Sequence, residues 1–244
     1  MGRTLVIGDI HGGYRAVKQV LERAAVTPND KLIFLGDYVD GWGQSPEVLD
    51  LLMELDENHD CIFLRGNHDD LLMTFLKTGE YNVQWFDHGG RMTIENYREL
   101  MPEIKWRHVE FLESLKDSFL DDKNRLFVHA GFTSLNGISH EHFKRMLFWD
   151  RTLWETALAL DKSMDVDHPF YPKRFTLYKE IFIGHTPVTR IGKTVPVQMA
   201  NVWNVDTGAA FKGPVTMMDA DTKEFWQSDA VYTLYPEENG RNRV

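Results

Sequence analysis

The sequence predicts an α/β fold, in which strands and helices alternate along the chain. Short apolar runs of strand length are separated by longer segments whose apolar residues follow the helical period. Several of these runs end in glycine and in polar residues of the types that bind metal ions. Because an open α/β sheet binds ligands at the carboxyl ends of its strands, we expect these polar residues to share one site.

Length and composition favour a single domain spanning residues 1–244. Hydrophobic residues make up 43% of the chain and charged residues 26%, as in an ordinary globular protein. The polar residues of interest run from position 9 to position 185, and no linker rich in proline, serine or glycine separates them. We therefore expect one domain that carries one site.

Charge and cysteine content limit the possible partners. The net charge of −10 argues against general nucleic-acid binding, which needs a basic surface. A single phosphate group remains possible as a ligand, because bound divalent cations make a pocket locally positive. No apolar run approaches the ~18 residues of a membrane span and the chain opens with a predicted strand, so we expect a cytoplasmic protein without a membrane partner. The one cysteine, Cys61, lies in an apolar run and is predicted to be a buried core residue.

The first part of the chain alternates strands and helices. Three strands are predicted, at residues 3–7, 31–35 and 61–64. Residues 14–25 have apolar positions at helical spacing, and a second helix is predicted to begin at Ser45-Pro46, which suit the N-cap and the first helical residue.

The remainder is predicted to be helical first and then rich in short strands. A mostly helical lobe is expected at about residues 70–117, followed by a hairpin over 119–128. Helical segments are expected between residues 140 and 160, and a strand at 180–183. Short strands and turns are predicted from Val188 on, with a frayed tail from Glu237.

The predicted site begins at Gly8-Asp9-Ile10-His11-Gly12, which directly follows the first strand. A carboxylate and an imidazole two residues apart leave the strand end on the same side and can bind one metal ion. Taken alone, the pattern also fits an aspartate that caps the next helix beside an exposed histidine. Further metal-binding residue types follow four later strands, at Asp37, Asn67-His68, His129 and His185.

Five sequence blocks occur in a characteristic order: Gly8-Asp9-Ile10-His11-Gly12, Gly36-Asp37-Tyr38-Val39-Asp40, Leu64-Arg65-Gly66-Asn67-His68-Asp69, Val128-His129-Ala130-Gly131 and Ile183-Gly184-His185-Thr186-Pro187. Together they resemble the signature of the phosphoprotein phosphatase (PPP) family, within the calcineurin-like metallophosphoesterase superfamily. The resemblance covers residues 5 to about 208, and residues 85–97 and 148–151 are similar to blocks of the bacterial branch. It implies a central mixed β-sandwich flanked by helices, which is α/β in composition and α+β in strict layering.

The resemblance also implies a dinuclear metal site. Six residues would bind the two ions: Asp9 and His11 the first, Asp37 both, and Asn67, His129 and His185 the second. Carboxylate, amide oxygen and imidazole suit manganese, iron or zinc, and we expect manganese. Two such ions can hold a bridging hydroxide that attacks the phosphorus directly.

Three further residues have implied catalytic roles. His68 would protonate the leaving oxygen, Asp40 would orient the imidazole of His68, and Arg151 would bind the phosphate. Arg151 could instead pair with Asp150 or another acid. Arg65 is interpreted as a structural ion-pair partner.

Two aromatic residues of the helical lobe allow two interpretations. Trp85 and Tyr97 could shape a substrate cleft or pack in the core of the lobe.

The sequence departs from the family pattern at two places. Asp69 stands where the family usually has glutamate, a loss of one methylene from which we expect little. Gly41-Trp42 stands where the family has Arg-Gly, and that arginine normally binds the phosphate. Either Arg151 and the metals suffice, or another cation reaches the site, or Gly41 and Trp42 open the cleft to a larger substrate that stacks on the indole. We favour the open cleft.

The predicted activity is metal-dependent hydrolysis of phosphomonoesters, foremost of phosphoserine and phosphothreonine in proteins. An alternative is hydrolysis of dinucleoside polyphosphates or other nucleotide phosphoesters, since related folds share the metal chemistry. A second alternative is a phosphate-sensing or scaffold protein without turnover. The presence of His68 and Asp40 argues against that alternative, because a binding protein needs no general acid.

Overall fold

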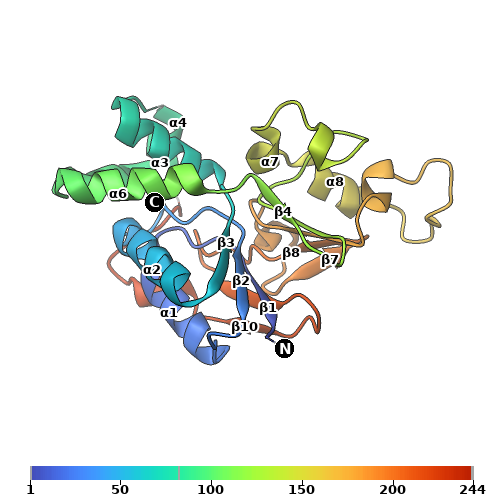
Figure 1. Ribbon diagram of the computed structural model, residues 1–244, viewed down its shortest axis with the longest axis horizontal. Helices are drawn as coiled ribbons and strands as arrows, with labels where there is room; N and C mark the ends of the chain where they lie inside the picture. Colours follow the sequence, from blue (N-terminus) through green and yellow to red (C-terminus); the bar gives the residue numbers. More distant parts are fainter. Residues whose placement is uncertain (1, 82, 243–244) are drawn as a thin grey trace.

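Two five-stranded sheets pack face to face, with helices on their outer sides (Figure 1). The computed structural model describes residues 2–81 and 83–242. The first sheet has the order β10 (Phe225–Gln227), β9 (Thr216–Asp219), β1 (Thr4–Ile7), β2 (Lys31–Phe34), β3 (Asp60–Phe63). The second has the order β4 (Ser118–Leu120), β5 (Arg125–Val128), β6 (Glu180–Ile183), β8 (Val202–Asn204), β7 (Val197–Met199). Each sheet mixes parallel and antiparallel pairs, so the predicted α/β class and mixed sandwich are confirmed.

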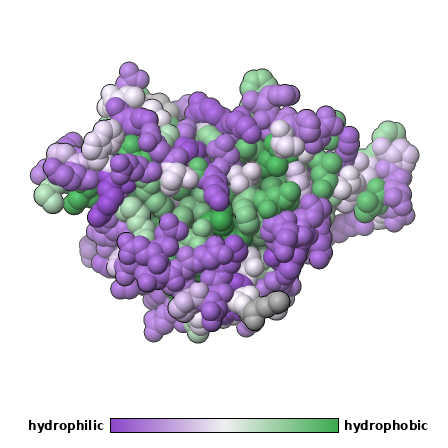
Figure 2. All heavy atoms as spheres, viewed as in Figure 1, coloured by the Kyte–Doolittle hydropathy of each residue, from purple (hydrophilic) through white to green (hydrophobic). Residues whose placement is uncertain are grey.

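Side chains of the central strands alternate between two hydrophobic cores, one between the sheets and one under the helices. Val6 of β1 and Phe127 and Phe182 of the second sheet belong to the cluster between the sheets, where the two phenyl rings stack with centroids 4.9 Å apart. Their neighbours Leu5 and Ile7 point the other way, into the cluster under the helices. Burial on both faces explains why these strands are continuous apolar runs in the sequence. Figure 2 shows hydrophilic residues over most of one face and hydrophobic residues gathered near its middle.

Helices α1 (Tyr14–Arg23) and α2 (Ser45–Asn58) connect the parallel strands of the first sheet. Helix α1 buries Ala16, Val17 and Val20, the apolar positions at helical spacing. The parallel register pairs Ile7 with Phe34 and Phe34 with Phe63, so the three strands end level with one another. The loops after these strands therefore begin at one edge of the sheet.

The predicted helical lobe is present. It consists of α3 (Asn67–Thr78), α4 (Val83–Trp85), the π-helical turn η1 (Phe86–Gly90), α5 (Arg91–Arg98) and α6 (Pro102–Ser114). In Figure 1 these helices lie at the opposite side of the molecule from α7 (Met146–Trp149) and α8 (Thr152–Ala159). Helix α3 begins directly after β3, so its first turn lies at the same sheet edge as the loops above.

The structure corrects two predictions about single segments. The chain from Glu237 was expected to fray, but the Glu238 carboxylate accepts a hydrogen bond from the Gly43 N–H at 2.7 Å. The Arg241 N–H also donates to the carbonyl of Ala210 at 2.9 Å. Cys61 is only partly buried against the core, where desolvation raises the pKa of its thiol to about 12.

Three short helical segments supplement this framework: η2 (Ile138–His140), η3 (Lys173–Thr176) and η4 (Val188–Ile191). A further helix, α9 (Val231–Leu234), lies in a region for which only strands and turns were predicted. Within residues 2–81 and 83–242, no helix has both the length and the apolar character needed to cross a membrane.

Candidate active site

The structure brings the side chains of the five sequence blocks together at the carboxyl ends of the strands. Asp9 and His11 follow β1, Asp37 and Asp40 follow β2, Asn67 and His68 open α3, His129 follows β5 and His185 follows β6. Each of these eight residues is at most 9% exposed. Such burial of acids and imidazoles requires compensating charges or hydrogen bonds.

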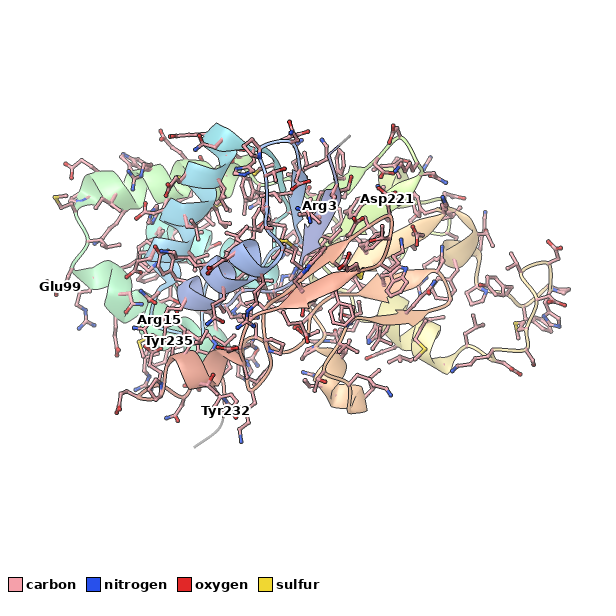
Figure 3. The ribbon with its side chains drawn as sticks, turned by 90° about the horizontal axis from the view of Figure 1, so that it is seen from below. Arg3, Arg15, Glu99, Asp221, Tyr232 and Tyr235 are labelled. Atoms are coloured by element: carbon pink, nitrogen blue, oxygen red, sulfur yellow. The ribbon has the colours of Figure 1, made fainter. Side chains whose placement is uncertain are left out.

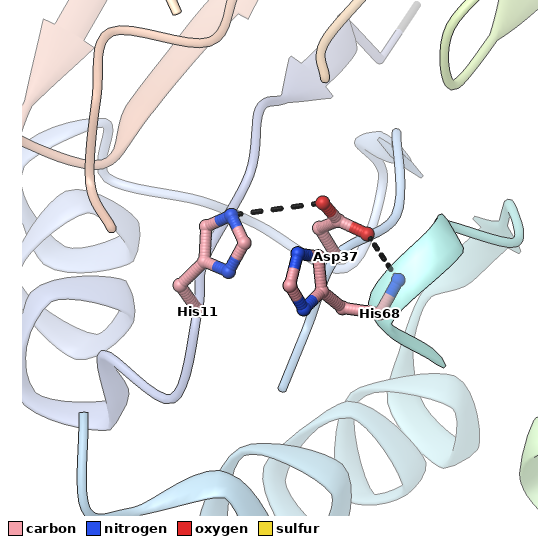
Figure 4. A group of neighbouring side chains, drawn as sticks. All are labelled: His11, Asp37 and His68. Carbon is pink, nitrogen blue, oxygen red and sulfur yellow. Dashed lines mark hydrogen bonds and ion pairs between the residues drawn. The ribbon is translucent and has the colours of Figure 1, made fainter. Parts of the chain in front are cut away.

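Asp37 lies at the centre of this group. Its Oδ2 is 3.6 Å from the Nε2 of His11, and its Oδ1 is 3.5 Å from the Nε2 of His129. Asp9 faces the same nitrogen of His11 at 3.7 Å. Figure 4 shows the Asp37 carboxylate directed towards His11 on one side, while on the other it accepts the backbone N–H of His68 at 2.9 Å.

A second set of donor atoms lies on the other side of Asp37. The Oδ1 of Asn67 is 3.3 Å from the Nε2 of His129 and 2.9 Å from the Nδ1 of His185. The Nε2 of His185 is buried and has no hydrogen-bond partner. An imidazole nitrogen left in this state among carboxylates and amides is a natural metal ligand.

These donor atoms fit metal ions chemically. Among the described residues, two groups could hold an ion, namely His11, Asp37 and His68, and Asp37, His129 and His185, with donor atoms within 4.8 Å of one another. Two ligands at about 2.0–2.2 Å from one ion can lie at most about 4.4 Å apart. The distances of 3.6 Å from Asp37 to His11 and 3.5 Å from Asp37 to His129 satisfy this limit. Asp37 belongs to both groups, and His68 falls within the first by distance although the resemblance gives it another role.

The protonation of the site reflects its crowded charges. Burial raises the pKa of Asp9 to about 7 and that of Asp206 to about 8. Burial opposes ionisation of Asp37 as well, but the combined effects of His129, His68 and His11 outweigh it and hold the pKa of Asp37 well below its usual value. Burial, with the charge of His129, lowers the pKa of His185. A bound cation would displace protons from such groups and supply the positive charge that the carboxylates need.

The backbone of the site is held in an uncommon conformation. Four of its non-glycine residues have left-handed φ values: His11 at 53°, Asp37 at 54°, Asp40 at 74° and His185 at 67°. Such conformations cost of order 1–3 kcal/mol each and persist only where the surroundings enforce them. The sequence gives no sign of this strain.

Two glycines of the sequence blocks are required because atoms of neighbouring loops approach them closely. A Cβ at Gly66 would lie 2.1 Å from the backbone nitrogen of Asp37, and a Cβ at Gly184 would lie 2.1 Å from the Oδ1 of Asp9. Neither position could accept a side chain without displacing a site carboxylate. The packing of the loops therefore explains why both positions are glycine.

Asp69 fixes the loop that carries Asp37. Its buried carboxylate accepts the backbone N–H groups of Asp37 at 2.8 Å, Tyr38 at 2.9 Å and Gly66 at 2.9 Å. The supporting role expected for this acid is therefore performed by the shorter aspartate side chain.

His68 is oriented by a buried network. Its Nδ1 lies 2.5 Å from the Oδ2 of Asp40, which is fully buried. Because an ionised carboxylate only accepts hydrogen bonds, Nδ1 carries the proton and Nε2 is the other atom available for proton transfer. Trp85 donates its indole N–H to the same Oδ2 at 2.5 Å, and Thr93 donates its hydroxyl to Oδ1 at 2.6 Å.

The sequence did not reveal these two partners of Asp40. Trp85 and Tyr97 are both buried in the lobe, as the core-packing interpretation requires, but the polar edge of Trp85 also supports the site. No feature of the sequence singles out Thr93 as a partner of Asp40. The one signal in the sequence is that Trp85 and Thr93 both lie in the block of residues 85–97.

Arg151 lies beside the second group of donors. Its side chain is exposed at the start of α8, and its charge adds to burial and His129 in lowering the pKa of His185. The alternative pairing with Asp150 is not formed, because that carboxylate caps α8 through the N–H groups of Thr152 and Leu153. Arg151 has no ion pair with the residues that the structure describes.

Arg65 performs the structural role predicted for it. Its guanidinium lies 3.7 Å from carboxylate oxygens of Asp70 and Asp117.

Trp42 corrects the open-cleft hypothesis. The indole is fully buried, donates its N–H to the carbonyl of Ala209 at 2.7 Å and stacks on Tyr235 with centroids 5.5 Å apart. It has no face available for a substrate, so the expected stacking of a substrate on Trp42 is wrong.

A mixed β-sandwich whose strand ends gather carboxylates, imidazoles and an amide around one buried aspartate defines a metallophosphoesterase. Residues 2–209 match the family model of the calcineurin-like phosphoesterases, and the chain belongs to this family.

Relatives of this chain carry two kinds of name. It is 28% identical over 236 residues to "Bis(5'-nucleosyl)-tetraphosphatase PrpE [asymmetrical]" of Geobacillus thermodenitrificans, covering 87% of this chain and 88% of the relative. It is 24% identical to "Serine/threonine-protein phosphatase 1" of Salmonella typhimurium over 220 residues, covering 87% and 89%. The crystal structure of a candidate diadenosine tetraphosphatase has the same fold, with a TM-score of 0.64, 15% identity and 94% of both chains covered. The predicted PPP resemblance is thus confirmed for the superfamily, while the names favour the nucleotide alternative.

Replacement of Trp85 by phenylalanine tests the network around Asp40. The variant keeps an aromatic ring but removes a hydrogen bond to a fully buried carboxylate, so the free energy of unfolding should fall by about 1.5–3 kcal/mol. Denaturant unfolding measures this change. The control is Trp106→Phe, at an indole that is 66% exposed, which should change stability by less than about 0.5 kcal/mol. Equal losses in both variants would contradict the role of the Trp85 indole.

Proposed function

We propose that this protein hydrolyses dinucleoside polyphosphates at a two-metal centre. The observation that carries the proposal is the similarity, over 88% of its length, to a relative named as a bis(5'-nucleosyl)-tetraphosphatase. The metal-ligand side chains proposed are those assembled around Asp37: Asp9, His11, Asp37, Asn67, His129 and His185.

The donor set supports two hard or borderline cations. Asp9 and His11 would hold one ion, Asn67, His129 and His185 the other, and Asp37 would contact both. We propose manganese as the first choice, with iron or zinc as alternatives, since the set offers oxygen and imidazole but no thiolate. Two such ions supply Lewis acidity and lower the pKa of water so that it can attack phosphorus.

The chain's own residues would handle the proton and the phosphate. His68, held by Asp40, would donate the Nε2 proton of its imidazolium to the oxygen that leaves phosphorus. Arg151, which interacts with Glu155 but forms no ion pair among the described residues, would bind a non-bridging phosphate oxygen. Asp69, Trp85 and Thr93 would keep these groups in place.

A cluster of arginines supports a substrate with several phosphates. Partial burial, together with the charges of Arg190 and Arg241, lowers the pKa of Arg151. The charges of Arg190 and Arg241 both act on Arg151, so an anion beside Arg151 would be favoured, and a polyphosphate carries more negative charge than a phosphomonoester. In an acidic protein, such a cluster is consistent with a role in binding substrate.

A neighbouring cleft could receive a nucleoside. The cleft has a volume of about 480 Å³ beside α3 and is lined in part by Tyr81, Trp85 and Arg145. The Tyr81 side chain is 53% exposed, so its ring is available for stacking on a base, an interaction worth about 1–3 kcal/mol.

Dephosphorylation of phosphoserine or phosphothreonine proteins is the second candidate. It is supported by the similarity to the phosphatase of Salmonella typhimurium and uses the same metal and proton groups. A non-catalytic phosphate sensor is less well supported, because a protein that only binds phosphate would not need the general acid proposed for His68 and Asp40.

A hydrolysis screen with added manganese distinguishes the two candidates. We expect diadenosine tetraphosphate to be cleaved with a higher kcat/KM than phosphoserine and phosphothreonine peptides. Chromatography of the nucleotide products would show whether the tetraphosphate is split asymmetrically, as the name of the relative indicates. Hydrolysis of the peptides without cleavage of the dinucleotide would favour the protein phosphatase.

Asp37→Asn tests the bridging position. The variant removes the one carboxylate charge that both donor groups share, so the content of both metals should fall. Turnover should decrease by at least about 100-fold, since even residues that only support a metal ligand contribute about 10–100-fold. Elemental analysis and kinetics measure the two effects. The control Asp122→Asn, at an exposed acid of the β4–β5 turn, should change neither. Retention of both metals and full activity in Asp37→Asn would refute the assignment.

His68→Asn separates a general acid from a metal ligand. A general acid contributes about 10²–10⁴-fold, and more for a poor leaving group. The variant should therefore keep its metals and lose far more activity on an alkyl phosphate than on an activated aryl phosphate. The control is His142→Asn, which changes an exposed histidine and should leave both rates unchanged. Equal losses on both substrates, or loss of metal, would remove His68 from this role.

A further inference from the structure

The structure shows what occupies the space beside Gly41, where the resembling family has its arginine. Gly41 has a φ of 98°, and a Cβ built there would lie 3.6 Å from the Cβ of His11 and 3.5 Å from the Cγ of Arg241. On the other side, a Cβ at Gly89 would lie 3.1 Å from the same Cγ. The Arg241 side chain therefore passes between two glycines, next to a proposed metal ligand.

Trp42 packs against the chain segment that carries Arg241. A Cβ at Gly240 would be 2.6 Å from the Trp42 ring, so the backbone lies directly against the indole. Tyr235 stacks on Trp42 and accepts the backbone N–H of Arg15 of α1 at 3.1 Å. Figure 3 shows Tyr235 beside Arg15, whose guanidinium lies 4.8 Å from the centre of the tyrosine ring.

Backbone hydrogen bonds complete the attachment of this segment. The Arg241 N–H donates to the carbonyl of Ala210, and Gly43 donates its N–H to Glu238. These backbone hydrogen bonds anchor the segment without using the polar groups of the Arg241 guanidinium.

The guanidinium of Arg241 lies 5.5 Å from the centre of the Phe211 ring, but among the described residues it lacks the polar partners expected of a structural arginine. Its Nε is buried without a hydrogen-bond partner, and it forms no ion pair within the part of the chain that the structure describes. A positive group this close to the site, in a chain of net charge −10, is available for an anionic ligand.

We propose that Arg241 is a substrate-binding residue, whose guanidinium binds a non-bridging phosphate oxygen in place of the arginine missing at position 41. This inference rests on the proposed phosphoesterase site. Gly41 leaves room for the Arg241 side chain and Trp42 anchors its segment, so the glycine and the tryptophan that replace the family's Arg-Gly are parts of one change. Of the three explanations for the missing arginine, the structure favours a cation that reaches in from elsewhere.

Arg241→Met tests the proposal with inorganic phosphate as the probe. Methionine keeps a Cγ beside Gly41 and Gly89 and leaves the backbone hydrogen bond in place, so the variant loses the cation and its contact with the Phe211 ring. Titration calorimetry of the manganese-supplemented protein should show phosphate binding weakened by about 10–100-fold, the value of one or more charge-assisted hydrogen bonds. Manganese content and the denaturant midpoint should match the wild type. Arg241→Lys should recover part of the affinity.

The control is Arg98→Met, which removes an exposed arginine whose side chain forms no hydrogen bond or ion pair with the described residues. It should bind phosphate as the wild type does. The proposal is overturned if Arg241→Met also binds phosphate normally, or if it loses affinity only together with metal or stability.

The calorimetric readout separates this inference from the proposed function. If the screen detects no hydrolysis but Arg241→Met still weakens phosphate binding, the proposed function fails and the role of Arg241 stands. If the wild type hydrolyses diadenosine tetraphosphate and Arg241→Met has the same KM and the same phosphate affinity, the proposed function stands and the role of Arg241 fails.

Discussion

The burial of the Asp37 carboxylate is the constraint on which the rest of the site depends. At 2% exposure this group needs positive partners, and the imidazoles of His11 and His129 approach it from two different sheets. Asp69 accepts the backbone N–H of Asp37, and this hydrogen bond fixes the backbone from which the Asp37 carboxylate projects. The two sheets must therefore bring their carboxyl ends together, and the cluster around Phe127 and Phe182 holds them at that distance.

The same constraint explains the strain in the loops. Left-handed backbone at His11, Asp37 and His185 turns each side chain towards a common centre immediately after its strand ends. Asp40 adopts the same conformation, which directs its carboxylate to His68. Each turn costs free energy, and the flanking strands, which are fixed in parallel register, offset that cost. A rigid scaffold with strained, preorganised loops is the arrangement that transition-state stabilisation requires.

The strand ends could be predicted from the sequence because their signals are local. An apolar run followed by glycine or a metal-binding residue type predicts both the strand and where it ends, and the strands that precede Asp9, Asp37 and His129 lie where they were predicted. The predictions failed where a role depends on residues far apart in the chain. Contacts of Asp40 with Trp85, of Trp42 with Tyr235, and of Gly41 with the Arg241 segment are fixed by the fold, and no short pattern encodes them.

The position of Arg241 reconciles two demands that conflict at residue 41. The loop between Asp40 and Trp42 needs a φ of 98° at Gly41, a conformation that a non-glycine residue adopts only with strain. Phosphate binding needs a long cationic side chain in the same place. When the cation comes from a separate segment, glycine keeps the loop geometry that directs Asp40 to His68, and the guanidinium still reaches the neighbourhood of His11. The strength of phosphate binding can then change with the anchoring of the segment on Trp42, while the metal-ligand loops stay as they are.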